Sequence, residues 1–175
     1  EAAQFCLNLP GWAIEEMAAL PAYLPRMEER MAAVIRFARL NTQQATGGPF
    51  AAGVFERDSG KLIVLAVNRV VPLRCSCAHA EVMAISLAQQ RLGCFDLGAP
   101  GQPAYELVVN WMPCAMCFGA VLWSGIRSLV VAGHGPEMEA ITGFDEGPLP
   151  PAWQEELQRR GISFHSTVLR DESLA

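Results

Sequence analysis

The sequence predicts an α/β fold in which one mixed sheet is covered by helices on both of its faces. A helical segment and a β-hairpin are followed by short buried strands that alternate with helices, and this order is typical of a sheet with helices packed on it. About 28 residues, with a helix among them, separate the last two expected strands. A connection of this length fits a parallel crossover rather than a hairpin, so we expect these two strands to run parallel.

Each element follows from apolar periodicity and from the residues that interrupt it. Apolar side chains recur at helical spacing over residues 26–44, and Gly47-Gly48-Pro49 ends the pattern. Residues 49–71 form two apolar runs around Asp58-Ser59-Gly60, which predicts a hairpin. Beyond the hairpin we expect helices over 79–92, 113–125 and 150–161, and strands over 105–111, 128–134 and 162–170. Pro113 suits a helix start, because the N–H that proline lacks is not needed there.

The N-terminal residues show no clear period and contain Pro10, Pro21 and Pro25. We expect residues 1–25 to be an irregular lead-in and residues 26–175 to be a single domain, since this length suits one core. No basic region precedes an apolar segment near the N-terminus, so no signal peptide is expected. No apolar run reaches the roughly 18 residues of a membrane span, so no membrane partner is expected.

The net charge and the cysteine content limit which kinds of partner and which cellular compartment fit the sequence. The net charge is −5, Lys61 is the single lysine, and no cluster of basic residues is present, which disfavours a nucleic acid polymer. Six cysteines in 175 residues are too few and too unevenly spaced for a disulfide scaffold. We therefore expect reduced thiols and a cytoplasmic location, with some cysteines used as metal ligands.

Two cysteines and one histidine have the spacing of a metal site. Cys114 and Cys117 are three residues apart, so one turn of a helix presents both thiols to one ion. Alone, this pair also fits a redox dithiol or a chance pair of buried cysteines. His79, at another expected helix start, completes a His-Cys-Cys set. Three protein ligands leave a fourth position for water, which is typical of a catalytic zinc, so we expect one Zn²⁺ per chain.

Glu81 lies two residues after His79, about 200° around a helix. This position is poor for a fourth ligand but suits a proton carrier beside the water. The order H-x-E followed by P-C-x-x-C is typical of zinc deaminases that act on bases. A glutamate that only answers the helix dipole is the alternative reading.

With these motifs, the chain resembles the cytidine-deaminase-like superfamily over residues 26–170. It is similar in detail to the guanine deaminase branch in the stretches GGPFAAGVFERDSG, NRVV, AHAEVMAISLAQ, PCAMCFGAVLWSGIRSLV and GFDEGP. The resemblance implies a three-layer α/β/α sandwich on a five-stranded mixed sheet with its last two strands parallel. It also implies hydrolytic deamination of a free nucleobase, guanine to xanthine, by a homodimer in purine metabolism.

The resemblance implies further site residues. Asn68 would bond the edge of the base, although it could instead be a turn residue that ends the hairpin. Phe50 would stack on the ring, although it could be ordinary core. Glu146 would be a second proton shuttle, with Asp145 as its rival, although both could simply face solvent. The remaining pocket residues implied are Ala80 and Phe144.

One departure from the family pattern leaves more than one substrate compatible with the sequence. Met112 stands where a glutamate commonly precedes the Pro-Cys pair, so ammeline or another s-triazine, cytosine or a nucleoside remain alternatives. Guanine deaminases also commonly extend further, with a C-terminal segment that closes the site. A transfer-RNA adenosine deaminase is disfavoured, since phosphates need basic counter-charge. Alternatives of another class are a non-catalytic zinc-stabilised domain and a thiol-redox protein.

The other candidate side chains are expected to have structural roles. The two cysteines before His79, at positions 75 and 77, are expected to be small buried residues beside the pocket, although Cys77 could close a four-ligand zinc site. Met116 and Trp123 fall at helical spacing and are expected in the core. His134 and His165 lack partners, and packing roles are expected for both.

Overall fold

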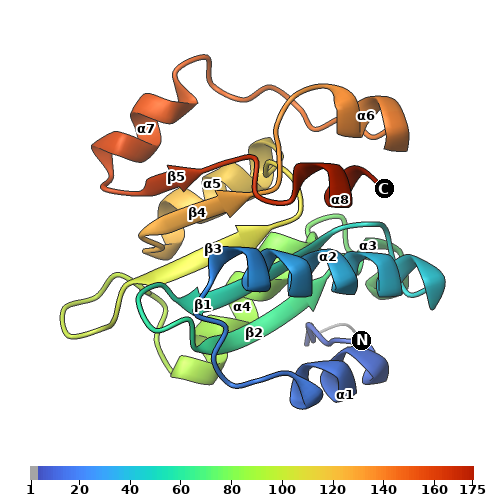
Figure 1. The fold of residues 1–175 in the computed structure, drawn as a ribbon, viewed down its shortest axis with the longest axis horizontal. Helices are drawn as coiled ribbons and strands as arrows, with labels where there is room; N and C mark the ends of the chain where they lie inside the picture. The colour runs from blue at the N-terminus through green and yellow to red at the C-terminus, as the bar shows by residue number, and fades with distance from the viewer. Residues whose placement is uncertain (1–3) are drawn as a thin grey trace.

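The computed structural model describes residues 4–175 (Figure 1). The helices are α1 (Gly11–Ala19), α2 (Met27–Gln43), α3 (Val70–Leu73), α4 (Ala80–Leu92), α5 (Ala115–Ser124), α6 (Glu137–Thr142), α7 (Trp153–Arg159) and α8 (Arg170–Leu174). The strands are β1 (Ala51–Glu56), β2 (Leu62–Val67), β3 (Tyr105–Val109), β4 (Ser128–Val131) and β5 (Ser163–His165).

The five strands form one mixed sheet in the order β2-β1-β3-β4-β5. Strand β1 is antiparallel to both β2 and β3, whereas β3, β4 and β5 are parallel. The predicted five-stranded mixed sheet and its parallel last pair are therefore confirmed. Both parallel connections carry a helix, because a parallel link has to cross the whole length of the sheet.

Helices cover both faces of the sheet, as the sequence predicts (Figure 1). Alternate strand residues point to opposite faces, so Leu107 and Leu129 meet the core beneath α4 and α5. Their neighbours Val108 and Val130 meet the core beneath α2. The fold is thus a three-layer α/β/α sandwich with a separate apolar core on each side of the sheet.

The hairpin and the crossovers bring distant segments to one edge of the sheet. Ala51 at the start of β1 pairs with Val67 at the end of β2, and Ala52 pairs with Val109 at the end of β3. Residues just before β1, just after β2 and just after β3 therefore meet at the carboxyl edge of β3. In α/β sheets this edge is where ligands usually bind.

The prediction of an irregular N-terminal lead-in is wrong for Gly11–Ala19, which form α1. Ala13 is fully buried in the core on the α2 side, and the Trp12 ring lies 5.6 Å from that of Phe37. This packing stabilises a nine-residue helix that its local sequence signals poorly. Residues 1–3 of the lead-in lie outside the described residues, and the domain boundary at residue 25 stays a prediction.

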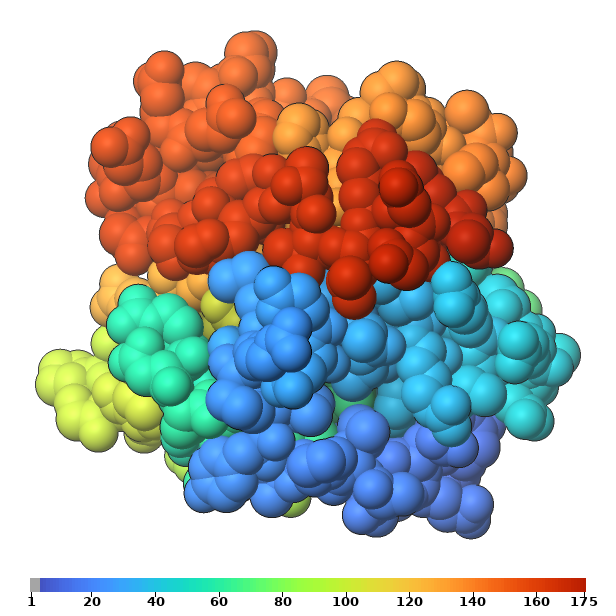
Figure 2. Space-filling view, viewed as in Figure 1, coloured from blue at the N-terminus to red at the C-terminus, as the bar shows by residue number. Residues whose placement is uncertain are grey.

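The C-terminal strand is shorter than predicted. Strand β5 ends at His165, because Thr167 and Leu169 adopt positive φ angles, and α8 begins at Arg170. The C-terminal segment lies along α2, where Arg39 Nη2 donates to the Glu172 carbonyl at 2.6 Å (Figure 2). Helices α3, α6 and α8 were not predicted, and β2 ends at Val67 rather than at residue 71. Among residues 4–175, no helix has the length and hydropathy that crossing a membrane requires.

The expectation that Met116 and Trp123 are core residues is wrong. Trp123 is 86% exposed and Met116 is 38% exposed. Seven residues separate them, so they share one face of α5, but Phe118 and Val121 occupy the face that packs on the sheet. Helical spacing shows that two residues share a face without showing which face is buried.

Candidate active site

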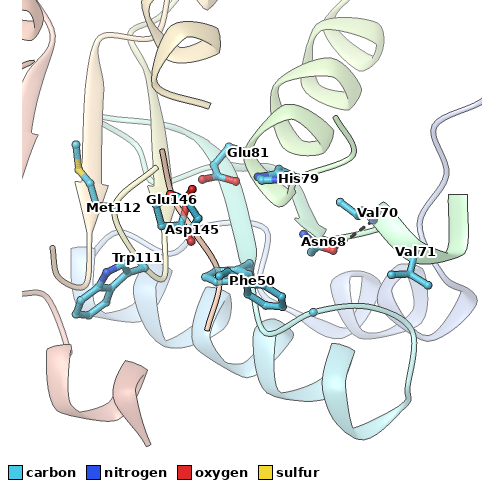
Figure 3. A pocket seen from close by; sticks show the side chains of 12 residues that line it. Phe50, Asn68, Val70, Val71, His79, Glu81, Trp111, Met112, Asp145 and Glu146 are labelled. Atoms are coloured by element: carbon cyan, nitrogen blue, oxygen red, sulfur yellow. Dashed lines mark hydrogen bonds between the residues drawn. The ribbon is translucent and has the colours of Figure 1, made fainter. Parts of the chain in front are cut away.

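A cavity of about 280 Å³ opens at the carboxyl edge of β3 (Figure 3). This volume is near the lower end of the range of ligand pockets, roughly 300–1,000 Å³, and suits one small molecule. The side chains that line it come from the loop before β1, the turn after β2, the start of α4, the end of β3 and the loop after α6. Those used below are Phe50, Asn68, His79, Glu81, Trp111, Met112, Phe144, Asp145 and Glu146.

The three predicted metal ligands are brought together by two helix starts. His79 is the N-cap of α4, Cys114 is the N-cap of α5, and Cys117 lies in the first turn of α5. Their ligand atoms all lie within 4.8 Å of one another, and Cys114 Sγ is 3.5 Å from His79 Nδ1. Neither N-cap side chain makes a capping hydrogen bond. The two side chains are therefore directed toward each other rather than to their own helices.

This donor set fits zinc. One imidazole and two thiols are the N and S ligands that zinc prefers, and three of them match the ligand count of catalytic zinc sites. Two helix N-termini, with their partial positive charge, also favour the deprotonated thiols that bind metals. His79, Cys114 and Cys117 would hold the ion. Within residues 4–175 they are the one such group, and the exposed Cys77 does not belong to it.

The thiols of Cys114 and Cys117 shift each other's pKa in opposite directions. A hydrogen bond from Cys117 lowers the pKa of Cys114 to about 4, and the contact with His79 acts in the same direction. The same bond to Cys114, followed by burial, raises the pKa of Cys117. The hydrogen bond to Cys114 also raises the pKa of His79. Both thiols have to give up their protons when they bind a metal ion.

Glu81 is a buried carboxyl group at the cavity wall. It lies in the first turn of α4, is 6% exposed, and lines the cavity beside His79 (Figure 3). Burial is the main cause that raises the pKa of Glu81 to about 7. A carboxyl group with this pKa can take up and give back a proton at neutral pH, which is the requirement for a general acid and base.

Asn68 and Phe50 form one wall of the cavity, and a backbone hydrogen bond joins them. The Asn68 N–H donates to the Phe50 carbonyl at 2.9 Å, so the two residues keep a constant spacing. The Asn68 side-chain oxygen accepts the Val70 N–H at 3.3 Å, which orients the amide (Figure 3). The Phe50 ring lies 6.2 Å from that of Phe144. This wall offers an amide and an aromatic face to a flat ligand.

Glu146 and Asp145 both line the cavity, but their surroundings differ. Glu146 is partly buried, and burial raises the pKa of its carboxyl group. Its carbonyl accepts the Ala115 N–H at 3.0 Å, which ties this loop to the start of α5. Asp145 is exposed, and its Oδ1 accepts the Gly147 N–H at 2.8 Å within the loop. The geometry therefore favours Glu146 as the acid that faces a ligand.

Other predicted residues have mixed outcomes. The expectation that the two cysteines before His79 are buried beside the pocket is wrong, because Cys77 is exposed and Cys75 is only partly buried. Ala80 is fully buried but is not among the cavity-lining residues. His134 packs against Trp153 and Phe164, with ring centroids at 6.1 and 6.4 Å, as a packing role predicts. His165 is exposed.

Several cavity residues were not predicted. Trp111 and Val70 line the cavity, as does Val71, which is 80% exposed at its mouth. Met112, the departure from the family pattern, also lines it. Trp111 lies two residues after the end of β3. A position just beyond a buried strand is the signal by which it could have been found.

Comparison with known proteins defines the class. Residues 25–133 match the cytidine and deoxycytidylate deaminase zinc-binding region, and the chain belongs to this family. It is a zinc-dependent hydrolase, an aminohydrolase, with the cytidine deaminase-like fold. The resemblance seen in the sequence is confirmed.

Similar proteins within this family include guanine deaminases. The chain is similar to guanine deaminase from Nitrosomonas europaea, with 49% identity, a TM-score of 0.93, and coverage of 99% of this chain and 94% of that one. It has the same identity, TM-score and coverage with a variant of NE0047 in complex with 8-azaguanine. It is also 31% identical to guanine deaminase of Bacillus subtilis over 71% of this chain and 75% of that protein.

Proposed function

We propose that this enzyme deaminates guanine, converting guanine and water into xanthine and ammonia. The observation that carries the proposal is the meeting, in one small cavity, of the His-Cys-Cys ligand set, the buried Glu81 and the wall formed by Phe50 and Asn68. Similarity to guanine deaminases over nearly the whole chain supports guanine as the ring.

Glu81 is the proposed proton carrier. When bound to His79, Cys114 and Cys117, zinc supplies Lewis-acid activation of the attacking water. Glu81 accepts the proton that this water gives up and delivers it to the ring nitrogen beside the carbon under attack. Its pKa of about 7 allows it to act in both directions at neutral pH.

Glu146 is the proposed second acid. The departing amino group has to gain a proton before it leaves as ammonia, and a partly buried acid with a raised pKa can supply one. Asn68 would bond the edge of the purine, and Phe50 would stack on its face, with Phe144 beside it.

The first test is ammonia release from guanine by the zinc-loaded protein, with ammeline, cytosine and adenosine measured alongside. We expect release from guanine to exceed release from the other rings. Release from another ring alone would contradict guanine while keeping the same chemistry. Such a result would assign the difference to Met112, which lines the cavity. No release from any ring would favour a non-catalytic zinc domain.

We also propose that the enzyme is a homodimer that works in purine metabolism in the cytoplasm. Helix α5 has no charged residue, and its outer face exposes Met116 and Trp123. Phe95, 88% exposed, lies in a loop tied to the end of α5 by the bond from the Leu97 N–H to the Ser124 carbonyl at 2.9 Å. Large apolar side chains exposed in this way suit contact with a second copy of the chain. All six cysteines are free, which suits a reducing compartment.

The dimer is tested by Trp123→Glu. A charge at the centre of this surface should convert a dimer into a monomer, measured by sedimentation equilibrium. The matched control is Tyr23→Glu, at another exposed aromatic residue. A wild-type protein that is monomeric at micromolar concentration would contradict the proposal.

A further inference from the structure

Phe50 belongs to a loop that is itself part of no helix or strand. Residues 47–50 lie between α2 and β1, and Gly48 and Phe50 line the cavity. A loop with so few regular hydrogen bonds needs partners elsewhere in order to keep one conformation. Two buried asparagines supply them from opposite sides.

The first asparagine is Asn41, which is fully buried near the end of α2. Its Nδ2 donates to the Gly48 carbonyl at 2.8 Å and to the Asn68 carbonyl at 2.9 Å. A single amide therefore joins the loop before β1 to the turn after β2, and both ends of this bridge line the cavity. Its Oδ1 accepts the Thr46 hydroxyl at 2.8 Å, which leaves the amide one orientation.

Close packing makes this bridge intolerant of change. A Cβ at Gly47 would lie 2.0 Å from the Asn68 carbonyl oxygen and 2.6 Å from Asn41 Nδ2. The loop thus approaches the Asn68 backbone as closely as a glycine allows, and Asn41 occupies the remaining space. Thr46 also accepts the Trp12 indole N–H at 2.9 Å, which extends the network to α1.

The second asparagine is Asn110, 3% exposed, directly after β3 and before Trp111. Its Nδ2 donates to the Pro49 carbonyl at 3.0 Å, and its Oδ1 accepts the Ala51 N–H at 2.9 Å. The loop is therefore held by amide donors on two successive carbonyls, one from α2 and one from the end of β3. Neither asparagine is among the cavity-lining residues.

We propose that Asn41 and Asn110 are positioning residues of the active site, which hold Phe50 and Asn68 at the spacing that a flat ring requires. This inference rests on the proposed function, because it assigns the ring to that wall. Neither residue touches the ring. Both act through the loop and the Asn68 backbone, so their loss should weaken ring binding while zinc binding persists.

The test uses Asn41→Asp and Asn110→Asp, which keep the side-chain shape and the acceptor oxygen but remove the amide donor. We expect KM for guanine to rise about tenfold or more in each variant, because buried carbonyls lose their hydrogen-bond donor. Asn41→Asp affects the carbonyls of Gly48 and Asn68, and Asn110→Asp affects that of Pro49. Zinc content should equal that of the wild type. The dissociation constant of 8-azaguanine, measured by calorimetry, should rise by a similar factor, and this readout does not need turnover.

Two controls separate positioning from general stability. Ser128→Ala removes a buried hydrogen bond to Glu106 far from the cavity and should lower Tm without changing KM. Asn68→Ala keeps the backbone carbonyl that Asn41 binds but removes the side chain that would bond the ring. In that background, Asn41→Asp should raise KM by a smaller factor than in the wild type, because part of its effect acts through the lost side chain.

The outcomes are distinct. Variants that lower Tm but leave KM and 8-azaguanine binding unchanged would overturn the positioning role, as would full additivity with Asn68→Ala. A wild type that neither deaminates guanine nor binds 8-azaguanine would instead overturn the proposed function, and the positioning inference with it.

Discussion

Buried polar side chains lie near both ends of β3, but they differ in where their partners lie. At the start of the strand, Glu106 accepts from Arg30 at 2.5 Å and from the Ser128 hydroxyl at 2.7 Å. Arg30 also donates to the backbone carbonyls of Pro25 and Arg57. We call Arg30, Glu106 and Ser128 the ion-pair cluster. Its charges are compensated within the protein.

Near the end of the same strand, the buried carboxyl group of Glu81, in the first turn of α4, lines a cavity. Burial raises its pKa to about 7, so it resists ionisation where an ion-paired carboxylate would not. A buried acid with a raised pKa suits the proton transfer that we propose for Glu81. The comparison teaches that buried polar groups near the two ends of one strand differ in their surroundings: one group is paired within the protein, and the other lines a cavity, as the proposed chemistry requires.

The largest expected effect comes from removing a metal ligand. Cys117→Ser should lose zinc and reduce ammonia release to background, because two ligands hold the ion far less well than three. Zinc content by atomic emission and Tm with and without added zinc are the measurements. The matched control is Cys77→Ser, at an exposed thiol outside the ligand set, which should keep both zinc and activity. Zinc loss in the control would mean that the ligand set is wrong.

The next effect is at Glu81. Glu81→Gln should lower kcat by about 10³-fold, the range of a general acid and base, while zinc stays bound. Because the substitution removes a buried acid without an ion-pair partner, Tm should be equal to or above that of the wild type. Steady-state kinetics and thermal unfolding on the same preparation test both parts. Undiminished turnover with zinc bound would contradict the role of Glu81.

Breaking the ion-pair cluster should lower stability and leave activity unchanged, which is the opposite of the effect expected for Glu81→Gln. Arg30→Met leaves the Glu106 carboxylate buried and unpaired, which should lower the free energy of unfolding by about 3–5 kcal/mol. The second change Glu106→Gln should restore part of the loss, since the uncompensated charge is gone. Urea unfolding measures stability, and KM for guanine should be unchanged. A raised KM would mean that this end of β3 also serves the site.

The smallest effect distinguishes the two loop acids. Glu146→Gln should lower kcat by about 10²-fold, and Asp145→Asn by less, because Asp145 already accepts the Gly147 N–H. The ratio of the two kcat values is the measurement. The reverse order would assign the second shuttle to Asp145.

Much of the architecture could be predicted because local patterns report it. The period of residues 26–44 predicts α2, and the turn at residues 58–60 predicts the hairpin. The helix α1 could not be predicted in this way, because its stability comes from packing on Phe37 rather than from its own sequence. The orientation of α5 was also hidden, since Trp123 and Phe118 are equally apolar and only the sheet distinguishes them.

The sequence by itself determined the five strands in order, the helices α2, α4, α5 and α7, and the predicted ligand set His79, Cys114 and Cys117. Helix and strand geometry depend on the covalent chain, so spacing within a few residues already specifies which side chains share a turn. Only the tertiary structure decided the burial that raises the pKa of Glu81, the exposure of Cys77, and the contact of Asn41 with Asn68. Burial and through-space contact depend on segments far apart in the chain, and no local pattern records them.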